Sequence, residues 1–297
     1  DANAYNNVLV KFTLLRNAKY LKINIEDVDG NEIKIIDERE NLSKDVKIDQ
    51  EVMAKVNFYW QWSGGIYDKK LGVKKPIDEG QYYINVYAKP DFTGANMQKL
   101  SFPIKIDKTP PKVEVADLFF IDSPEFELNI KAKDEGIVDS KINTFLFLLN
   151  GKKYEEDGEF IFKISNENDY YKKKFVLNNS LNTIDIGVTD HARNMAYAQT
   201  RIIVRDLSKI KVEPKKITYD NKTPFTIKYD IDDSSVINYE ICLDSWDNVI
   251  ENTDKKEFIF DKMVQNQSHK IIIKALDKDG NIVDATYIDM DVDTNTS

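Results

Sequence analysis

The feature that most constrains the fold is a period-two alternation of apolar and polar residues along the chain. In FELNIKAKD, apolar side chains stand at every second position of 126–132, and the same alternation returns at 225–231 and at 21–25. Successive side chains of a strand point to opposite faces, so this spacing predicts half-buried strands. Tyr and Phe, 15 of each among 297 residues, favour the same class because aromatic residues suit pleated surfaces.

The central and C-terminal thirds of the chain also align with each other. The matching segments are SKINTFLFLL (from Ser140) with SVINYEICL (from Ser235), EFIF (159–162) with EFIF (257–260), and NTIDIGVTDHARNMAYA (from Asn182) with HKIIIKALDKDGNIVDA (from His269). In the last pair Asp190 falls on Asp277, and Asn194 falls on Asn281. We therefore expect two copies of one module, each a little under a hundred residues, with a tight hairpin at DKDGN.

Two short connectors divide the chain into three parts. IDKTPPKV (106–113) carries consecutive prolines that cannot donate ladder hydrogen bonds, and RDLSKIKVEPKK (205–216) forms the second connector. Short strands separated by turns indicate sandwiches. We expect an all-β chain of three consecutive β-sandwich domains at 1–109, 110–206 and 207–297. Because the connectors are short, the domains should stack end to end as a semi-rigid rod.

Charge and composition narrow the function classes. The net charge is −9, and it runs from +1 in 1–109 (17 basic, 16 acidic) to −4 in 110–206 (13, 17) and −6 in 207–297 (12, 18). An acidic chain without a basic patch argues against nucleic acid as a partner. No stretch of about 18 apolar residues occurs, so we expect no membrane insertion. A single cysteine, Cys242, excludes an internal disulfide and is expected to pack within a strand.

Four motifs in the first third carry a family resemblance. They are RNAKYLKINIEDVDGNEIK (from Arg16), WQWSGGIYD (from Trp60), IDEGQYYINVYA (from Ile77) and FPIKIDKTPPKV (from Phe102). In this order they resemble a fibronectin type III-like domain of Gram-positive cell-envelope subtilisin-like serine peptidases, the family of lactocepin and of the complement-cleaving peptidases of pathogenic cocci. The resemblance covers residues 15–113. Two motifs depart from the family: Trp-Asp-Gly becomes Trp-Ser-Gly, and Asp-Gly-Gln-Tyr becomes Glu-Gly-Gln-Tyr.

The resemblance implies a location and a role. In the family such domains follow the catalytic domain and form a stalk before the wall anchor. The first domain is then fibronectin type III-like, and the next two are bacterial Ig-like. The chain starts at Asp1 without a methionine, so we interpret it as a segment of a longer, secreted, cell-wall-associated protein whose catalytic domain lies upstream. Its partners would be that catalytic domain and a host or nutrient protein substrate, and we expect a monomer.

Aromatic residues of the first domain have two readings. Trp60 and Trp62 share one face of a strand, and one of them is expected to anchor the core. Gly64 and Gly65 would permit the turn that follows. The residues that alternate with Tyr83 and Tyr87 should face the core; they are Tyr82, Ile84, Val86 and Ala88. The two tyrosines themselves either pack in the core or form an exposed contact patch.

No catalytic constellation emerges from the sequence. The two histidines, His191 and His269, are expected to be solvent-facing turn or edge residues, and no Gly-x-Ser-x-Gly motif or subtilase nucleophile motif is present. The oxygen-rich stretches EDVDGN, LDKDGN and DIDDSS raise calcium as an alternative, but their spacing does not match an EF-hand. We therefore predict no catalytic, cofactor-binding or metal-binding residue and no cofactor.

Two functions of different classes fit these patterns. The favoured hypothesis is a set of non-catalytic accessory domains that position the catalytic domain of a surface peptidase and contribute contacts to large substrates. The alternative is the stalk or ligand-binding region of a bacterial surface adhesin, with Tyr83 and Tyr87 as its contact patch. Accessory modules of a carbohydrate-active enzyme are a third, weaker reading.

Overall fold

The computed structural model describes residues 9–51, 65–68, 73–76, 78–159, 161–163 and 170–293. These residues form twenty-five strands and one short 3₁₀-helix at Arg205–Leu207. Within the described part, no helix has the length and apolar character needed to cross a membrane. The predicted fold class, all-β with consecutive Ig- and fibronectin type III-like sandwiches, is confirmed.

The described residues fall into two compact units. The first unit combines the chain up to Lys112 with two inserted segments, Lys133–Asn143 and Thr189–Met195. The second unit contains the rest of the described chain. Among the described residues, every strand pairing joins strands that lie within one of the three ranges expected from the sequence. The domain limits at 109/110 and 206/207 themselves stay a prediction.

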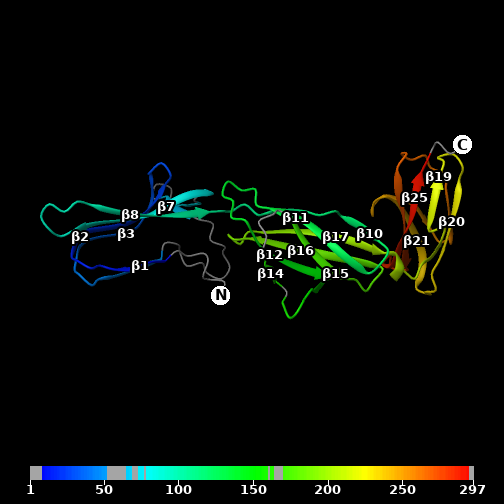
Figure 1. Cartoon of the computed structure of the whole chain (residues 1–297), viewed down its shortest axis with the longest axis horizontal. Helices are drawn as coiled ribbons and strands as arrows, with labels where there is room; N and C mark the ends of the chain where they lie inside the picture. The colour runs from blue at the N-terminus through cyan, green and yellow to red at the C-terminus, as the bar shows by residue number, and fades with distance from the viewer. Residues whose placement is uncertain are drawn as a thin grey trace. The chain divides into compact units, whose positions relative to one another are not determined.

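A four-stranded sheet of order β3-β2-β7-β8 organises the N-terminal sandwich (Figure 1). Its strands, with the smaller pairs β1-β4 and β5-β6, are β1 (Leu9–Thr13), β2 (Ala18–Asp27), β3 (Glu32–Leu42), β4 (Lys47–Glu51), β5 (Gly65–Asp68), β6 (Val73–Pro76), β7 (Gly80–Pro90) and β8 (Gln98–Ile106). The predicted core face is confirmed: Leu21 and Ile23 on β2 are fully buried, and Ile84 on β7 is almost so. All three pack in one apolar cluster.

Strand β3 departs from simple alternation. Ile36 and Ile33 pack against the core cluster, whereas Ile35 is 44% exposed. The cause is a register shift, because Ile23 pairs with Asp37 while the next residue, Asn24, pairs with Ile35. Such a bulge places an extra residue on one strand and reverses the direction of the side chains beyond it.

The two later sandwiches share one topology, as the internal repeat predicts. The central sandwich pairs its strands in the orders β9-β11-β15 and β10-β17-β16-β12-β13, with β14 also on β12. The strands are β9 (Lys112–Glu114), β10 (Leu118–Ile121), β11 (Glu125–Lys133), β12 (Ile142–Leu149), β13 (Lys152–Lys153), β14 (Ile161–Lys163), β15 (Tyr170–Val176), β16 (Leu181–Asp190) and β17 (Met195–Val204).

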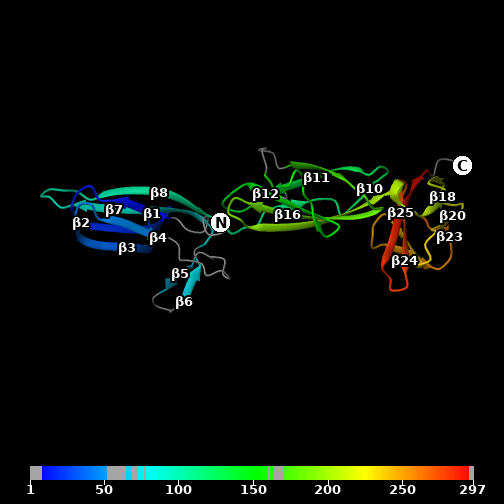
Figure 2. The same ribbon diagram turned by 90° about the horizontal axis from the view of Figure 1, so that it is seen from below.

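The C-terminal sandwich repeats these orders as β18-β20-β23 and β19-β25-β24-β21-β22. Figure 2 shows β18, β20 and β23 on one side of it and β24 and β25 on the other. The strands are β18 (Lys211–Glu213), β19 (Lys216–Tyr219), β20 (Phe225–Asp230), β21 (Val236–Leu243), β22 (Val249–Thr253), β23 (Glu257–Phe260), β24 (Ser268–Asp277) and β25 (Ile282–Val292). In both sandwiches the first short strand of the larger sheet, β10 or β19, pairs in parallel with the last strand.

One part of the predicted repeat alignment is wrong. The EFIF of 257–260 is β23, which pairs with β20 in the smaller sheet. The last two residues of the earlier EFIF lie in β14, which pairs with β12 in the larger sheet. The structural counterpart of β23 is β15, which pairs with β11. The two EFIF segments are identical in sequence but not equivalent in structure, because any edge strand with alternating apolar residues carries the same local pattern.

Some expected residues fall outside the described part of the chain. They are Trp60, Trp62 and Gly64, so the predicted tryptophan anchor stays a prediction. Gly65 begins β5.

Buried isoleucines of the C-terminal sandwich should dominate its stability. Ile273 on β24 is fully buried, so Ile273→Ala should lower the free energy of unfolding by about 2–5 kcal/mol through lost burial and a residual cavity. Ile237 on the neighbouring β21 is 56% exposed, and Ile237→Ala should cost less than about 0.5 kcal/mol. Urea unfolding of both variants measures the difference; equal costs would contradict the assigned strand faces.

Candidate functional site

Strand β24 is buried on both of its faces, and this defines the candidate functional region within the second unit. Ile271 and Ile273 face the core of their own sandwich, while Ile272 on the opposite face is also fully buried. Ile272 packs with Tyr287 of β25 and with Ile203 of the central sandwich. Other members of this cluster are Leu118, Phe120, Leu181, Cys242 and Trp246. We call this contact between the two sandwiches the C-terminal junction.

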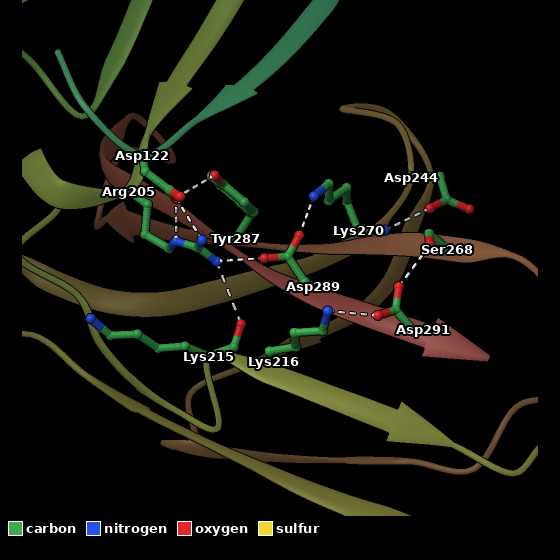
Figure 3. A network of polar contacts seen from close by, with 10 residues as sticks. All are labelled: Asp122, Arg205, Lys215, Lys216, Asp244, Ser268, Lys270, Tyr287, Asp289 and Asp291. Atoms are coloured by element: carbon green, nitrogen blue, oxygen red, sulfur yellow. Dashed lines mark hydrogen bonds and ion pairs between the residues drawn. The ribbon is translucent and has the colours of Figure 1, made fainter. Parts of the chain in front are cut away.

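Arg205 forms the polar centre of the C-terminal junction (Figure 3). It stands in the 3₁₀-helix that follows β17, and its guanidinium contacts Asp122 through Nε at 2.8 Å and Nη2 at 2.5 Å. Its Nη1 contacts Asp289 at 2.8 Å. The guanidinium also lies over the Tyr287 ring, 4.5 Å from its centroid. A planar fork suits this geometry because it binds carboxylates and stacks on an aromatic face at once.

Carboxylates complete the network around Arg205. The Tyr287 hydroxyl donates to Asp122 at 2.9 Å, and Lys270 forms an ion pair with Asp289. Burial alone would raise the pKa of Asp289, but the bonds from Lys270 and Arg205 outweigh it and lower that pKa. Burial, reinforced by the bond to Asp122, raises the pKa of Tyr287. Asp289 is therefore ionised and the Tyr287 hydroxyl is protonated at neutral pH.

Asp284 ties the connector to both sandwiches. Its side chain is buried and accepts hydrogen bonds from Ser180 Oγ of the central sandwich and from the backbone N–H of Lys209, at 2.6 Å for the latter. Ser208 Oγ lies 3.2 Å from the same carboxylate. Two adjacent connector residues, Ser208 and Lys209, are thus held by one buried acid, which a flexible linker would not show.

A second set of polar contacts lies within the first unit, around Glu79. Its Oε2 accepts a hydrogen bond from Thr109 Oγ1 at 2.5 Å, and its Oε1 accepts one from the Val138 N–H at 3.1 Å. A Cβ on Gly136 would lie 2.5 Å from Glu79 Oε1, so glycine permits this approach. Glu79 is the residue at which the sequence departs from the family's Asp-Gly-Gln-Tyr motif. Its longer side chain makes contacts with the connector and with the 133–143 segment.

The same unit brings together three aspartates that sequence reasoning did not combine: Asp107, Asp134 and Asp190. Each stands at the end of a strand or directly after it. Asp107 lies in the connector after β8, and the other two lie at strand ends of the central sandwich, so acids at strand ends were the available signal.

The prediction for His269 is wrong, because this residue is buried with 5% of its surface exposed. Its Nδ1 lies 2.6 Å from Asp244 Oδ2, and its Nε2 lies 2.8 Å from the Gln265 carbonyl oxygen. Both ring nitrogens therefore have acceptor partners, and neither faces a serine hydroxyl. Burial would lower the pKa of His269, but the Asp244 carboxylate and the Gln265 carbonyl outweigh it and raise that pKa. His191 is exposed, as expected.

Other candidate residues are internal. Cys242 is fully buried in the C-terminal junction, and burial raises the pKa of its thiol, which suits packing. Tyr83 and Tyr87 are half-buried. The Tyr87 hydroxyl donates to the buried carboxylate of Glu26, which also binds Lys99 at 2.8 Å. Burial opposes ionisation of Glu26, but these bonds and one from Asn24 lower its pKa to about 2.

The oxygen-rich hairpins close turns. Asp27 accepts bonds from the Asn31 N–H and Nδ2, both at 2.8 Å. Asp277 accepts the equivalent bonds from the Asn281 N–H at 2.8 Å and Nδ2 at 3.0 Å. In DIDDSS, Asp233 accepts from the Ser235 N–H at 3.0 Å. These are Asx-type turn contacts that stabilise the backbone locally.

Over part of its length, the chain is similar in sequence to bacterial proteinases. It is 30% identical over 117 residues to the PI-type proteinase of Lactococcus lactis subsp. cremoris, a match covering 38% of this chain and 6% of that protein. The PII-type proteinase of Lacticaseibacillus paracasei is 28% identical over 114 residues, with the same coverage. The resemblance to cell-envelope proteinases is confirmed. The chain spans only a small part of the length of these relatives, and no family model matches it.

Solved structures give weaker likenesses. Fibronectin(III)-like modules of Clostridium thermocellum CbhA match 63% of this chain and 96% of theirs at 12% identity and a TM-score of 0.25. A tetra-tandem repeat of a large adhesion protein matches 97% of this chain and 71% of that one at 14% identity and a TM-score of 0.32. Scores this low support no argument, and the fold assignment rests on the strand pairing.

Removal of the Arg205 side chain should loosen the C-terminal junction. Arg205→Ala should lower the free energy of unfolding by about 2 kcal/mol, because Asp122 and Asp289 lose a partly buried partner. The control Lys216→Ala breaks an exposed pair with Asp291 and should cost less than about 1 kcal/mol. Urea unfolding and trypsin cleavage at the lysines of 208–215 provide the measurements. Unchanged cleavage in Arg205→Ala would argue that the connector is held without this network.

His269 should make stability depend on pH. Its folded pKa lies above its unfolded value of about 6.5, so its contribution is fully present below that pH and is lost as pH rises through the folded pKa. His269→Gln should remove this decline in the range above about pH 6.5. His191→Gln, at an exposed position, should keep the wild-type profile. Urea midpoints across that range test this; identical slopes for wild type and His269→Gln would contradict it.

Proposed function

We propose that this chain is a non-catalytic accessory segment of a secreted, cell-wall-associated subtilisin-like serine endopeptidase. The observation that carries the proposal is the identity of about 30% to PI-, PII- and PIII-type proteinases over 38% of the chain. The match covers only 6% of each proteinase, so it concerns a small part of a much longer protein.

The contacts of the candidate catalytic side chains favour a structural role for this chain over a catalytic role. Among the described residues, His269 engages an aspartate and a carbonyl oxygen with its two ring nitrogens, and Cys242 is shielded in an apolar cluster. A serine peptidase needs a histidine free to accept a proton from a serine. The chemistry would therefore come from another part of the parent protein.

The C-terminal junction supports the spacer component of the proposal. A spacer must resist bending, and domain contacts resist bending when they combine an apolar centre with specific polar bonds. Ile272 and Tyr287 supply the apolar centre, and Arg205 with Asp284 supplies the polar bonds. The parent's catalytic domain and a protein substrate are the partners that this role implies, at the cell surface.

The ligand-binding form of the adhesin alternative places its contact patch at Tyr83 and Tyr87. Tyr87 is bonded to Glu26, and the Tyr83 hydroxyl lies 3.4 Å from Gln81 Nε2. These internal contacts weaken the case for the two tyrosines as a ligand-binding surface.

Deletion in the parent protein tests the proposal. The full-length protein and a version without residues 1–297 should cleave a short chromogenic peptide with kcat/KM values within about twofold, because the catalytic site is untouched. Cleavage of intact casein by whole cells should fall at least about tenfold in the deletion. Three unrelated β-sandwiches of similar total length, inserted as a control, should restore it if the segment acts only as a spacer.

Two results would overturn the proposal. One is a parent gene without an upstream Asp, His and Ser catalytic domain. The other is specific binding of the isolated chain to a host matrix protein or glycan that Tyr83→Ala and Tyr87→Ala abolish. The isolated chain itself should hydrolyse neither casein nor peptide.

A further inference from the structure

Three carboxylates from separate segments converge within the first unit. Asp107 follows β8, Asp134 follows β11, and Asp190 ends β16. One carboxylate oxygen of each lies within 4.8 Å of those of the other two. Asp134 and Asp190 are 5% and 0% exposed, and Asp107 is half-buried. Buried carboxylates at this separation repel one another unless a proton or a cation lies between them.

One oxygen of this group has no partner. Asp107 Oδ2 is shielded from solvent and receives no hydrogen bond, while Oδ1 of the same residue accepts one from the Thr109 N–H at 3.0 Å. Buried polar atoms are nearly always paired, and an unpaired carboxylate oxygen is particularly unfavourable. This acceptor, beside two other buried acids, is placed to bind a proton or a cation.

The other two carboxylates are held in place by neutral donors. Asp134 accepts bonds from the N–H groups of Gly136 at 3.1 Å and Ser140 at 2.5 Å. Asp190 accepts from the Asn194 N–H at 2.9 Å and Nδ2 at 2.8 Å. Asp134 Oδ2 also accepts a bond from Ser140 Oγ at 3.0 Å, whereas Asp134 Oδ1 keeps a lone pair for a second partner. Outer-shell bonds of this kind orient the ligands of a metal site before the ion binds.

The three Asp-x-x-x-Asn hairpins show what is special about Asp190. Asp27, Asp190 and Asp277 bind their asparagines in the same way. Turn formation accounts for all three hairpins, but only Asp190 is fully buried and faces two more acids.

We propose that Asp107, Asp134 and Asp190 bind a calcium ion. All-oxygen, all-carboxylate donors favour hard cations over transition metals. Ligand oxygens on Ca²⁺ stand at about 2.3–2.6 Å from the ion, so oxygens up to about 5 Å apart can share it, whereas Mg²⁺ at about 2.1 Å needs a tighter group. The ion would fasten the IDKTPP connector to the loop that follows β11 and to the β16–β17 hairpin. This inference does not depend on the proposed accessory role.

Calorimetric titration of the full 297-residue chain tests the site. After removal of metal with EGTA, CaCl₂ should bind with one-to-one stoichiometry and a dissociation constant of about 10⁻⁴–10⁻³ M, the range of extracellular modules. Saturating Ca²⁺ should raise the melting temperature, and MgCl₂ should bind at least about tenfold more weakly. Absence of both heat and a melting shift at about 10 mM CaCl₂, well above that range, would refute the proposal.

Matched variants locate the ion. Asp107→Asn should weaken Ca²⁺ binding at least about tenfold, because it removes the charge of the unpaired carboxylate. Asp134→Asn serves as a second variant if Asp107→Asn does not fold, as judged by circular dichroism in EGTA. The control Asp277→Asn alters the equivalent hairpin of the C-terminal sandwich and should keep the affinity within about twofold. Wild-type affinity in the folded Asp107→Asn or Asp134→Asn variant, or equal loss in Asp277→Asn, would also refute it.

Discussion

The arrangement of the second unit depends on the burial of both faces of β24 and β25. A sheet with one apolar face needs one partner layer, but a strand with apolar residues on both faces needs two. Ile271 and Ile273 obtain their layer from β20 and β23 of the same sandwich, whereas Ile272 obtains its layer from the central sandwich. The two sandwiches therefore form a common hydrophobic contact, and the connector between them is part of a packed structure.

Charge placement gives this contact a defined geometry. Apolar surfaces alone can slide past each other because the hydrophobic effect is not directional. Arg205 binds two carboxylates at fixed angles, and Asp284 binds the connector backbone, so few relative positions satisfy both. Net stabilisation from such buried pairs is modest, and their main consequence here is orientation. Orientation is what the proposed accessory role requires.

The polar contacts of the first unit centre on acidic side chains, whereas those of the C-terminal junction centre on Arg205. Glu79 accepts hydrogen bonds from Thr109 and Val138, and three aspartates gather next to the same connector. In the C-terminal junction the cations belong to the chain itself, as Arg205 and Lys270 show. In the first unit the hydrogen bonds to Asp134 and Asp190 come from backbone N–H groups, a serine hydroxyl and an asparagine amide, and the three carboxylates lie close to one another.

The sequence by itself determined the strands and the repeat. Alternation at 126–132 and 225–231 identified core faces correctly, since a side-chain period of two is a local property of extended backbone. It also determined the hairpins, because Asp-x-x-x-Asn stabilises its own turn. Only the tertiary structure decided which strands pair and what lies beyond each face. Three features depend on partners far away in the chain. β15, and not the first EFIF, takes the position that β23 has in the C-terminal sandwich; a bulge exposes Ile35; and His269 is buried. The same is true of Arg205 and the three aspartates, whose meanings come from residues that folding brings within a few ångströms.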